Sequence, residues 1–190
     1  MGFLKKEDLE LLGFKKIGNN LKISENAIFY NHKNISIDDN TRIDDFCIIS
    51  AGTGGIEIGK YVHIAAYCSI QGVGKVIMED FSGLSSKVSI YSSSDDYSGI
   101  SMTNPCVLSE FTNVKSGDVT LKKHVIVGVG SSILPNVTIG LGSAIGAFSL
   151  VNSDIPDSVI AAGVPAKEKN KRSKKLFEIE IKFIEKIKKK

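Results

Sequence analysis

Tryptophan is absent from the sequence, and aromatic residues make up only 7% of its 190 residues. No apolar run approaches the roughly 20 residues that a membrane-spanning helix requires. The first residues also lack the apolar stretch that follows the basic start of a secretory signal peptide. We therefore expect a protein that has no membrane span and works in the cytoplasm.

Cysteine is also scarce. The three cysteines are an odd number and form no C-x-x-C pair, which argues against a disulfide framework or a thiolate zinc site. The three histidines stand 31 and 61 residues apart, without the close pair typical of histidine-ligated zinc. We expect no metal site and no metal requirement. We also expect all three cysteines to be small buried residues: Cys47, Cys68 and Cys106.

Excess charge of one sign is confined to the C-terminal end. Residues 167–190 hold 11 basic and 4 acidic residues, a net charge of +7, whereas the whole chain carries +3. The remaining 166 residues therefore carry −4 (13 basic against 17 acidic residues). A mildly acidic body gives no support to nucleic-acid binding.

What the sequence has in abundance is a six-residue repeat. An aliphatic residue recurs at every sixth position, often followed by glycine, and neither the helical period of 3.6 nor the strand period of 2 fits this spacing. The longest run is Leu121, Val127, Ile133, Ile139, Ile145 and Val151. Shorter runs upstream are Ile37, Ile43 and Ile49, then Ile58, Ile64 and Ile70, then Met78, Leu84 and Ile90.

This repeat predicts an all-β solenoid. Each group of six residues would form a short strand and a corner, and three groups would close one triangular coil of 18 residues. No coil can bury its apolar side alone, so coils must stack and the ends must be capped. Parallel pairing between coils satisfies the backbone. We expect about five to six coils.

Three segments depart from the repeat and define the organisation of the chain. Residues 1–17 are expected to form a helical cap, and residues 18–166 the solenoid. Residues 91–118 interrupt it as a long polar loop, a feature that is usually either functional or disordered. Residues 167–190 are expected to form a basic helix that docks on the coils through one apolar stripe. Its members are Leu176, Ile179, Phe183 and Ile187.

The last coils carry a recognisable signature. Residues 133–140 (ILPNVTIG) and 162–167 (AGVPAK) resemble the C-terminal motifs of CoA-dependent sugar acetyltransferases of the hexapeptide-repeat family. The resemblance covers roughly residues 15–170. It implies that the solenoid is a left-handed parallel β-helix, an exception to the usual right-handed crossover.

The first half narrows the resemblance. Residues 42–47 (RIDDFC), 63–67 (HIAAY), 84–86 (LSS) and 95–99 (DDYSG) are similar to bacterial N-acetyltransferases of nucleotide-linked aminodeoxysugars, of the thymidine-diphosphate 4-amino-4,6-dideoxyglucose type. The resemblance implies a homotrimer with active sites at the subunit interfaces. It also implies acetyl-CoA as co-substrate and a nucleotide sugar as acceptor. The product would serve a bacterial surface glycan such as lipopolysaccharide.

The same resemblance supplies candidate catalytic residues. Sugar-hydroxyl acetyltransferases use an Asn and a His at positions that are Lys87 and Asp95 here, and neither matches. Activating an alcohol requires a base, whereas a neutral amine is already a nucleophile. In the aminodeoxysugar enzymes a Ser and an Asp face the substrate, which implies Ser85 (or Ser86) and Asp95 (or Asp96). We expect Asp95 to orient the amine and Ser85 to stabilise the oxyanion.

Three other candidate site residues each have two possible interpretations. His63 is expected to point outward, where it either assists the amine or serves the surface and trimer packing. Lys87 either attracts the diphosphate or is merely solvated. Tyr97 either stacks on a base or packs the loop against a neighbouring subunit. We assign surface roles to His32 and His124.

For CoA, the resemblance implies backbone contacts to pantetheine at Val129 and Ala147. It also implies a phosphate contact at Lys167. The family has a further CoA-phosphate Arg three residues beyond, and Asn170 stands there in this chain.

Two other functions remain open from sequence. One is O-acetylation of a sugar or polysaccharide hydroxyl. The other is a non-catalytic solenoid scaffold that binds a partner along a flat face. A scaffold would gain no thermal stability from acetyl-CoA, whereas a specific site would.

Overall fold

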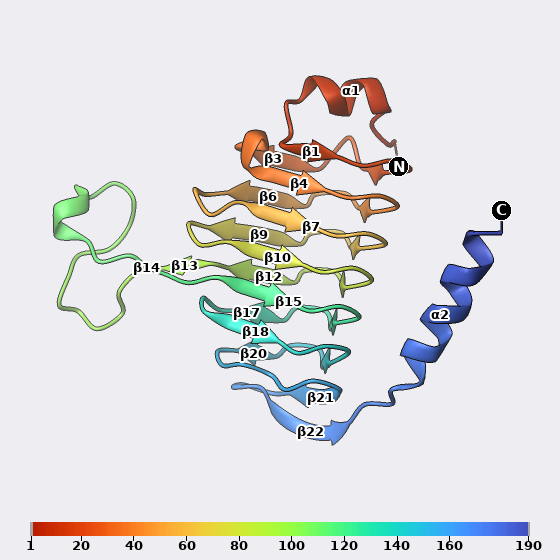
Figure 1. Cartoon of the computed structure of the whole chain (residues 1–190). Helices are drawn as coiled ribbons and strands as arrows, with labels where there is room; N and C mark the ends of the chain where they lie inside the picture. Colours follow the sequence, from red (N-terminus) through yellow and green to blue (C-terminus); the bar gives the residue numbers. More distant parts are fainter. Residues whose placement is uncertain (1, 190) are drawn as a thin grey trace.

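The computed structural model describes residues 2–189, and its body is a triangular prism of stacked coils (Figure 1). Each turn of the chain contributes one short strand to each of three parallel sheets. The architecture is the expected left-handed parallel β-helix. We call the three sheets the first, second and third faces, in the order in which the chain reaches them.

Most strands belong to these faces. The first face consists of β1 (Lys16–Ile17), β4 (Ile35–Ile37), β7 (Ile56–Ile58), β10 (Val76–Met78), β15 (Val119–Leu121) and β18 (Val137–Ile139). The second face consists of β2 (Lys22–Ile23), β5 (Arg42–Ile43), β8 (His63–Ile64), β11 (Gly83–Leu84), β16 (Ile126–Val127), β19 (Ala144–Ile145) and β21 (Val159–Ala162), with β22 (Lys167–Lys171) antiparallel at its edge. The third face consists of β3 (Ile28–Tyr30), β6 (Ile48–Ala51), β9 (Ser69–Gly72), β12 (Ser89–Tyr91), β17 (Ser132–Ile133) and β20 (Leu150–Val151).

The prism contains about seven coils, so the expected five to six was too low. The second face holds seven strands in parallel, one from each coil. The repeat is degenerate in the first and last coils, where Phe29 and Ala161 fill inward positions that elsewhere hold branched aliphatic residues. These coils pair with their neighbours through the backbone, which does not depend on the side chain.

The six-residue ladder is confirmed as the core. On the second face the inward residues pair in register from coil to coil, and all are almost completely buried. They are Ile23, Ile43, Ile64, Leu84, Val127 and Ile145. Burying one such side chain contributes about 1.5–3 kcal/mol, so the stacked columns account for much of the stability.

Both ends of the prism are covered. Helix α1 (Lys6–Leu11) lies over the first coil and buries Leu9. At the other end β22 pairs with β21 and covers an edge that would otherwise be open to another chain. The C-terminal segment thus begins as a strand, and helix α2 spans Lys175–Ile187 rather than the whole expected range of 167–190.

The interruption at 91–118 is an arm that projects away from the prism (Figure 1). It leaves and returns through an antiparallel pair, β13 (Ser93–Ser94) and β14 (Lys115–Ser116). A 3₁₀ turn (η2, Ser109–Phe111) lies in the arm, and another (η1, His32–Asn34) lies between β3 and β4.

In the described part of the chain no helix has the length and apolarity that crossing a bilayer demands.

Candidate functional site

The candidate catalytic serines lie on the corner between the second and third faces, which we call the second corner. Ser85 and Ser86 follow β11 there, and Ser86, Val129 and Ala147 occupy equivalent positions on three successive coils. Neighbouring strands are about 4.8 Å apart, so these positions form a track parallel to the prism axis. Lys167 pairs with Ala162 on β21 beyond the end of this track.

Two buried thiols fix the backbone of this corner. Cys47 and Cys68 lie in successive coils, and the Sγ of Cys68 donates a hydrogen bond to the carbonyl oxygen of Ser85 at 3.1 Å. Contact with Cys47, together with burial, raises the pKa of the Cys68 thiol, so the donor stays protonated. The expectation that all three cysteines are buried was wrong for Cys106. It is exposed because it lies in the projecting arm, away from any core.

Next to Ser85 an open pocket of about 510 Å³ lies on the second face. Strands β8, β11 and β16 form its floor, and the start of α2 forms one wall. His63, Ser85, Ser86, Ile126 and Leu176 are among its lining residues. The structure therefore brings His63 and the two serines to the same pocket.

A buried carboxylate holds His63 in place. The Nε2 atom of His63 lies 2.8 Å from Asp44 Oδ2, and the Nε of Arg42 donates to Asp44 Oδ1 at 2.6 Å. Burial by itself raises the pKa of the Asp44 carboxyl, but hydrogen bonds with His63 and Arg42 outweigh it. The pKa therefore lies below its ordinary value of 3.8. A carboxylate can only accept, so Nε2 is the donor, and neutral His63 keeps a lone pair on Nδ1.

Sequence reasoning missed Asp44 as a partner of His63. The available signal was modest: Arg42 and Asp44 alternate along one strand and share a face, and His63 lies one coil further on. Without the number of residues in that coil, the register could not be fixed.

The two candidate aspartates of the arm, Asp95 and Asp96, differ in the hydrogen bonds of their carboxylates. Asp96 is buried, and its carboxylate accepts hydrogen bonds from the Ser98 backbone N–H (3.0 Å), the Ser101 hydroxyl (3.1 Å) and the Asn113 amide (3.4 Å). These bonds lower the pKa of Asp96 to about 2. Asp96 therefore organises the arm. The Asp95 carboxylate has no such partner within residues 2–189 and remains the reactive candidate.

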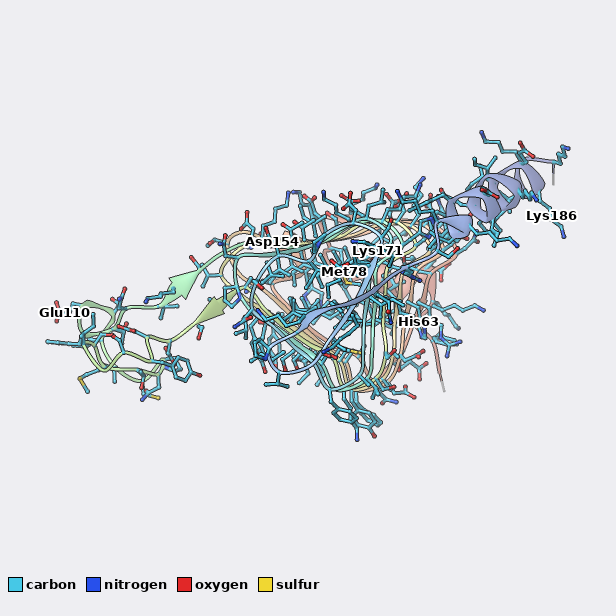
Figure 2. All side chains as sticks on the ribbon, turned by 90° about the horizontal axis from the view of Figure 1, so that it is seen from below. His63, Met78, Glu110, Asp154, Lys171 and Lys186 are labelled. Carbon is cyan, nitrogen blue, oxygen red and sulfur yellow. The ribbon has the colours of Figure 1, made fainter. Side chains whose placement is uncertain are left out.

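Ser85 and Asp95 do not meet within one chain. The arm departs from the corner between the third and first faces, whereas Ser85 lies on the second corner, and the third face separates them. Seen along the prism, Glu110 in the arm and His63 lie on opposite sides of the molecule (Figure 2). A site that uses both residues needs the arm of another copy.

The remaining candidates are exposed. Lys87 occupies the second corner with a left-handed backbone (φ 62°), directly after the two serines. Tyr97 is 92% exposed in the arm, and Lys167 is exposed on β22. None of the three contacts the Ser85 pocket, and they remain predictions.

Helix α2 docks on an aromatic column at the corner between the first and second faces. Glu180 bonds to His124 (2.8 Å) and Lys123 (2.5 Å), while Phe183 packs edge-on against Tyr61. Docking through Phe183 agrees with the expected apolar stripe, whereas Ile179 of the same stripe is 55% exposed. The expected surface role of His124 was wrong, because its ring stacks on Phe81 beneath the helix; the centroids are 5.0 Å apart.

The described residues do not form a metal site. Across residues 2–189 no three His, Cys, Asp or Glu side chains converge as metal ligands.

The stacked triangular coils, with Ser85 and Ser86 on the second corner beside the pocket, define a class of protein, the hexapeptide-repeat acyltransferases. No family model matches the chain. It is 52% identical to the dTDP-4-amino-4,6-dideoxy-D-glucose acyltransferase of Escherichia coli over 96% of this chain and 95% of that protein. The chain belongs to this acyltransferase family.

Solved structures agree. The N-acyltransferase AntD from Bacillus cereus is 42% identical, with a TM-score of 0.94 over 98% of this chain and 100% of that one, in complex with dTDP and CoA. Other AntD structures hold dTDP-4-amino-4,6-dideoxyglucose with CoA, or dTDP with 3-hydroxybutyryl-CoA. A maltose O-acetyltransferase from Clostridium difficile, 23% identical with a TM-score of 0.59, shares the fold alone.

Proposed function

We propose that this protein transfers an acetyl group from acetyl-CoA to the amine of a dTDP-linked 4-amino-4,6-dideoxyhexose. The observation that carries this proposal is the second corner, where Ser86 continues the track of Val129 and Ala147 and Ser85 lies directly before it, beside a pocket. Family membership supplies the substrate class. The reaction would take place in the cytoplasm and feed a bacterial surface glycan such as lipopolysaccharide.

We assign Ser85 and Asp95 to the reacting centre. The AntD variants of known structure are substituted at a serine and an aspartate ten positions apart. Ser85 and Asp95 have this spacing, and so do Ser86 and Asp96. The carboxylate of Asp96 is occupied inside the arm, which favours the first pair.

In the proposed mechanism, the amine nitrogen attacks the thioester carbon, the C–S bond breaks and an amide C–N bond forms. The Ser85 hydroxyl donates to the oxyanion of the tetrahedral intermediate, a contribution of about 2.7–4 kcal/mol for such a donor. Asp95 accepts a hydrogen bond from the amine and orients it. The nitrogen's proton passes to Nδ1 of His63, which Asp44 holds through Nε2, and then to the departing thiolate.

Substrate binding extends this site. Pantetheine would lie along Val129 and Ala147, with Lys167 near a CoA phosphate. Ser86 and Lys87 would meet the sugar and the diphosphate. Tyr97 and Asp96 would belong to the acceptor side, Tyr97 by contact and Asp96 by shaping the arm.

A homotrimer completes the site by bringing the arm of one subunit to the second corner of the next. The exposed apolar residues of the arm support this proposal, because a solvated loop gains nothing from them. They are Tyr97, Ile100, Met102, Leu108, Phe111 and Val114.

The test compares two acceptors that differ in one group, dTDP-4-amino-4,6-dideoxyglucose and dTDP-6-deoxyglucose, which carries a hydroxyl in place of the amine. Release of CoA thiol from acetyl-CoA is measured with each. We expect turnover with the amine only. Turnover confined to the hydroxyl acceptor would establish O-acetylation, and no turnover with either, without thermal stabilisation by acetyl-CoA, would favour a scaffold.

A further inference from the structure

One outward position of the second face has no side chain. Outward residues of this face pair in register from coil to coil, and Gly83 lies between His63 and Ile126. The complete column is Lys22, Arg42, His63, Gly83, Ile126, Ala144 and Ile160. Gly83 is the one glycine in this column, and it leads directly to the candidate catalytic serine two residues later.

The backbone does not require this glycine. Gly83 does not have a positive φ, and an added Cβ would meet nothing closer than the His63 carbonyl oxygen at 3.5 Å, an ordinary contact. At Gly128, by contrast, an added Cβ would approach the Ala147 nitrogen to 2.5 Å. Glycine inside a strand weakens it, and such a residue often marks a place where a ligand comes close to the backbone.

The space above Gly83 is part of the pocket, with His63 on one side and apolar side chains on the other. Ile126 is 46% exposed on the coil below, and Leu176 of α2 and Ala65 also line the pocket. The one guanidinium of the lining is engaged: Arg172 Nη1 donates to three backbone carbonyls, each at 3.0 Å.

We propose that the Gly83 hollow binds the acyl group of the donor thioester, and that it accepts chains longer than acetyl, such as propionyl and butyryl. This inference rests on the proposed function, because pantetheine on Val129 and Ala147 brings the thioester to the level of Ser85. The hollow opens two residues before Ser85, about 6.6 Å away along an extended backbone. The carbonyl faces Ser85, the alkyl end lies on Gly83 between Ile126 and Leu176, and the C–S bond stays open to the amine.

The test adds carbon atoms to the floor of the hollow. Gly83→Ala and Gly83→Val are compared with the wild-type protein, using acetyl-, propionyl- and butyryl-CoA at fixed acceptor. Ser36→Val, an outward position on the first face, is the control for added bulk. Thermal unfolding checks folding, and binding of each thioester without acceptor is measured by calorimetry.

We expect kcat/KM of the wild-type protein for butyryl-CoA to lie within tenfold of that for acetyl-CoA. Gly83→Val should lower the butyryl-to-acetyl ratio at least 30-fold, and Gly83→Ala should lower it less. Binding of butyryl-CoA should weaken in parallel while binding of free CoA is unchanged. Ser36→Val should leave the ratio unchanged.

Three results would overturn the proposal: rejection of butyryl-CoA by the wild-type protein, an unchanged ratio in Gly83→Val, or equal losses with both donors. Equal losses with a raised KM for the acceptor would assign the hollow to the sugar. Failure of the proposed function is distinguishable, because it would abolish acetyl transfer in the wild-type protein while the calorimetric comparison of thioesters still reports on the hollow.

Discussion

At Ser85 the structure combines a fixed backbone with a free hydroxyl. The Cys68 thiol holds the Ser85 carbonyl, and Ser85 lines the pocket with no side-chain hydrogen bond to residues 2–189. Sequence could indicate this serine only through its resemblance to known motifs, because small outward residues are common on every coil. The choice of Ser85 over Ser86 rests on the arm, because a spacing of ten residues pairs Ser86 with Asp96, whose carboxylate is already occupied.

Replacing Ser85 by alanine should lower kcat about 10²–10³-fold, because the oxyanion loses its donor. KM for both substrates should change little, since the interaction belongs to the transition state. Steady-state kinetics check this, with Ser86→Ala as the matched control, which should affect substrate affinity more than turnover. A Ser85→Ala effect confined to KM would contradict the oxyanion role.

Asp95→Asn and Asp96→Asn should give different phenotypes although the residues are adjacent. Asp95→Asn should keep CoA binding and thermal stability but lose at least about 10²-fold in kcat, because the amine loses its orienting carboxylate. Asp96→Asn should instead increase proteolysis of the arm, since a charged acceptor of several hydrogen bonds is lost. Full activity in Asp95→Asn would exclude Asp95 from the site.

Acid should loosen the arm through Asp96. Its pKa falls from the ordinary value of 3.8 to about 2 in the folded protein. The stabilising contribution is therefore fully present above about pH 4 and is lost as the pH falls towards 2. The protection factors of residues 97–114, which are hydrogen-exchange rates corrected for the intrinsic slowing of amide exchange in acid, should fall as the pH falls through this window in the wild-type protein. In Asp96→Asn they should be low at every pH, and unchanged wild-type protection factors would argue against the role of this carboxylate.

Among the elements, helix α2 shows where sequence reasoning works and where it stops. The apolar stripe predicted the docking correctly at Phe183 but not at Ile179, which is 55% exposed. It could not predict the partner, because the column of Tyr61, Phe81 and His124 exists only once the coils are stacked in register. Nor did the composition predict β22. Its exposed, mostly charged residues are compatible with a helix, and they form a strand because β21 provides an edge to pair with.

Phe183→Ala should lower the free energy of unfolding by about 1–2 kcal/mol, because two edge-on aromatic contacts are lost. Ile181→Ala is the control on the same helix, at a side chain that is 61% exposed, and it should change stability by less than about 0.5 kcal/mol. Chemical denaturation measures both. Equal effects would mean that α2 does not dock through Phe183.

For the whole molecule, the repeat made the prism predictable, since the inward positions of the middle coils all hold an aliphatic side chain. The number of coils was less predictable, because the end coils follow the backbone pairing without the full hydrophobic ladder. The assembly was approached from the sequence only by resemblance. The structure adds a physical reason: Ser85 and Asp95 lie on different corners, so one chain cannot bring both to one amine.

The most direct measurement is complementation between two inactive variants. Ser85→Ala and Asp95→Asn chains carrying different tags are co-expressed, and assemblies that contain both are purified on the two tags in turn. Every mixed trimer contains one junction at which an intact Ser85 meets an intact Asp95, so activity should return to about one third of the wild-type value per trimer. Activity no higher than that of the separate variants would show that the two residues do not act across subunits and would contradict the shared site.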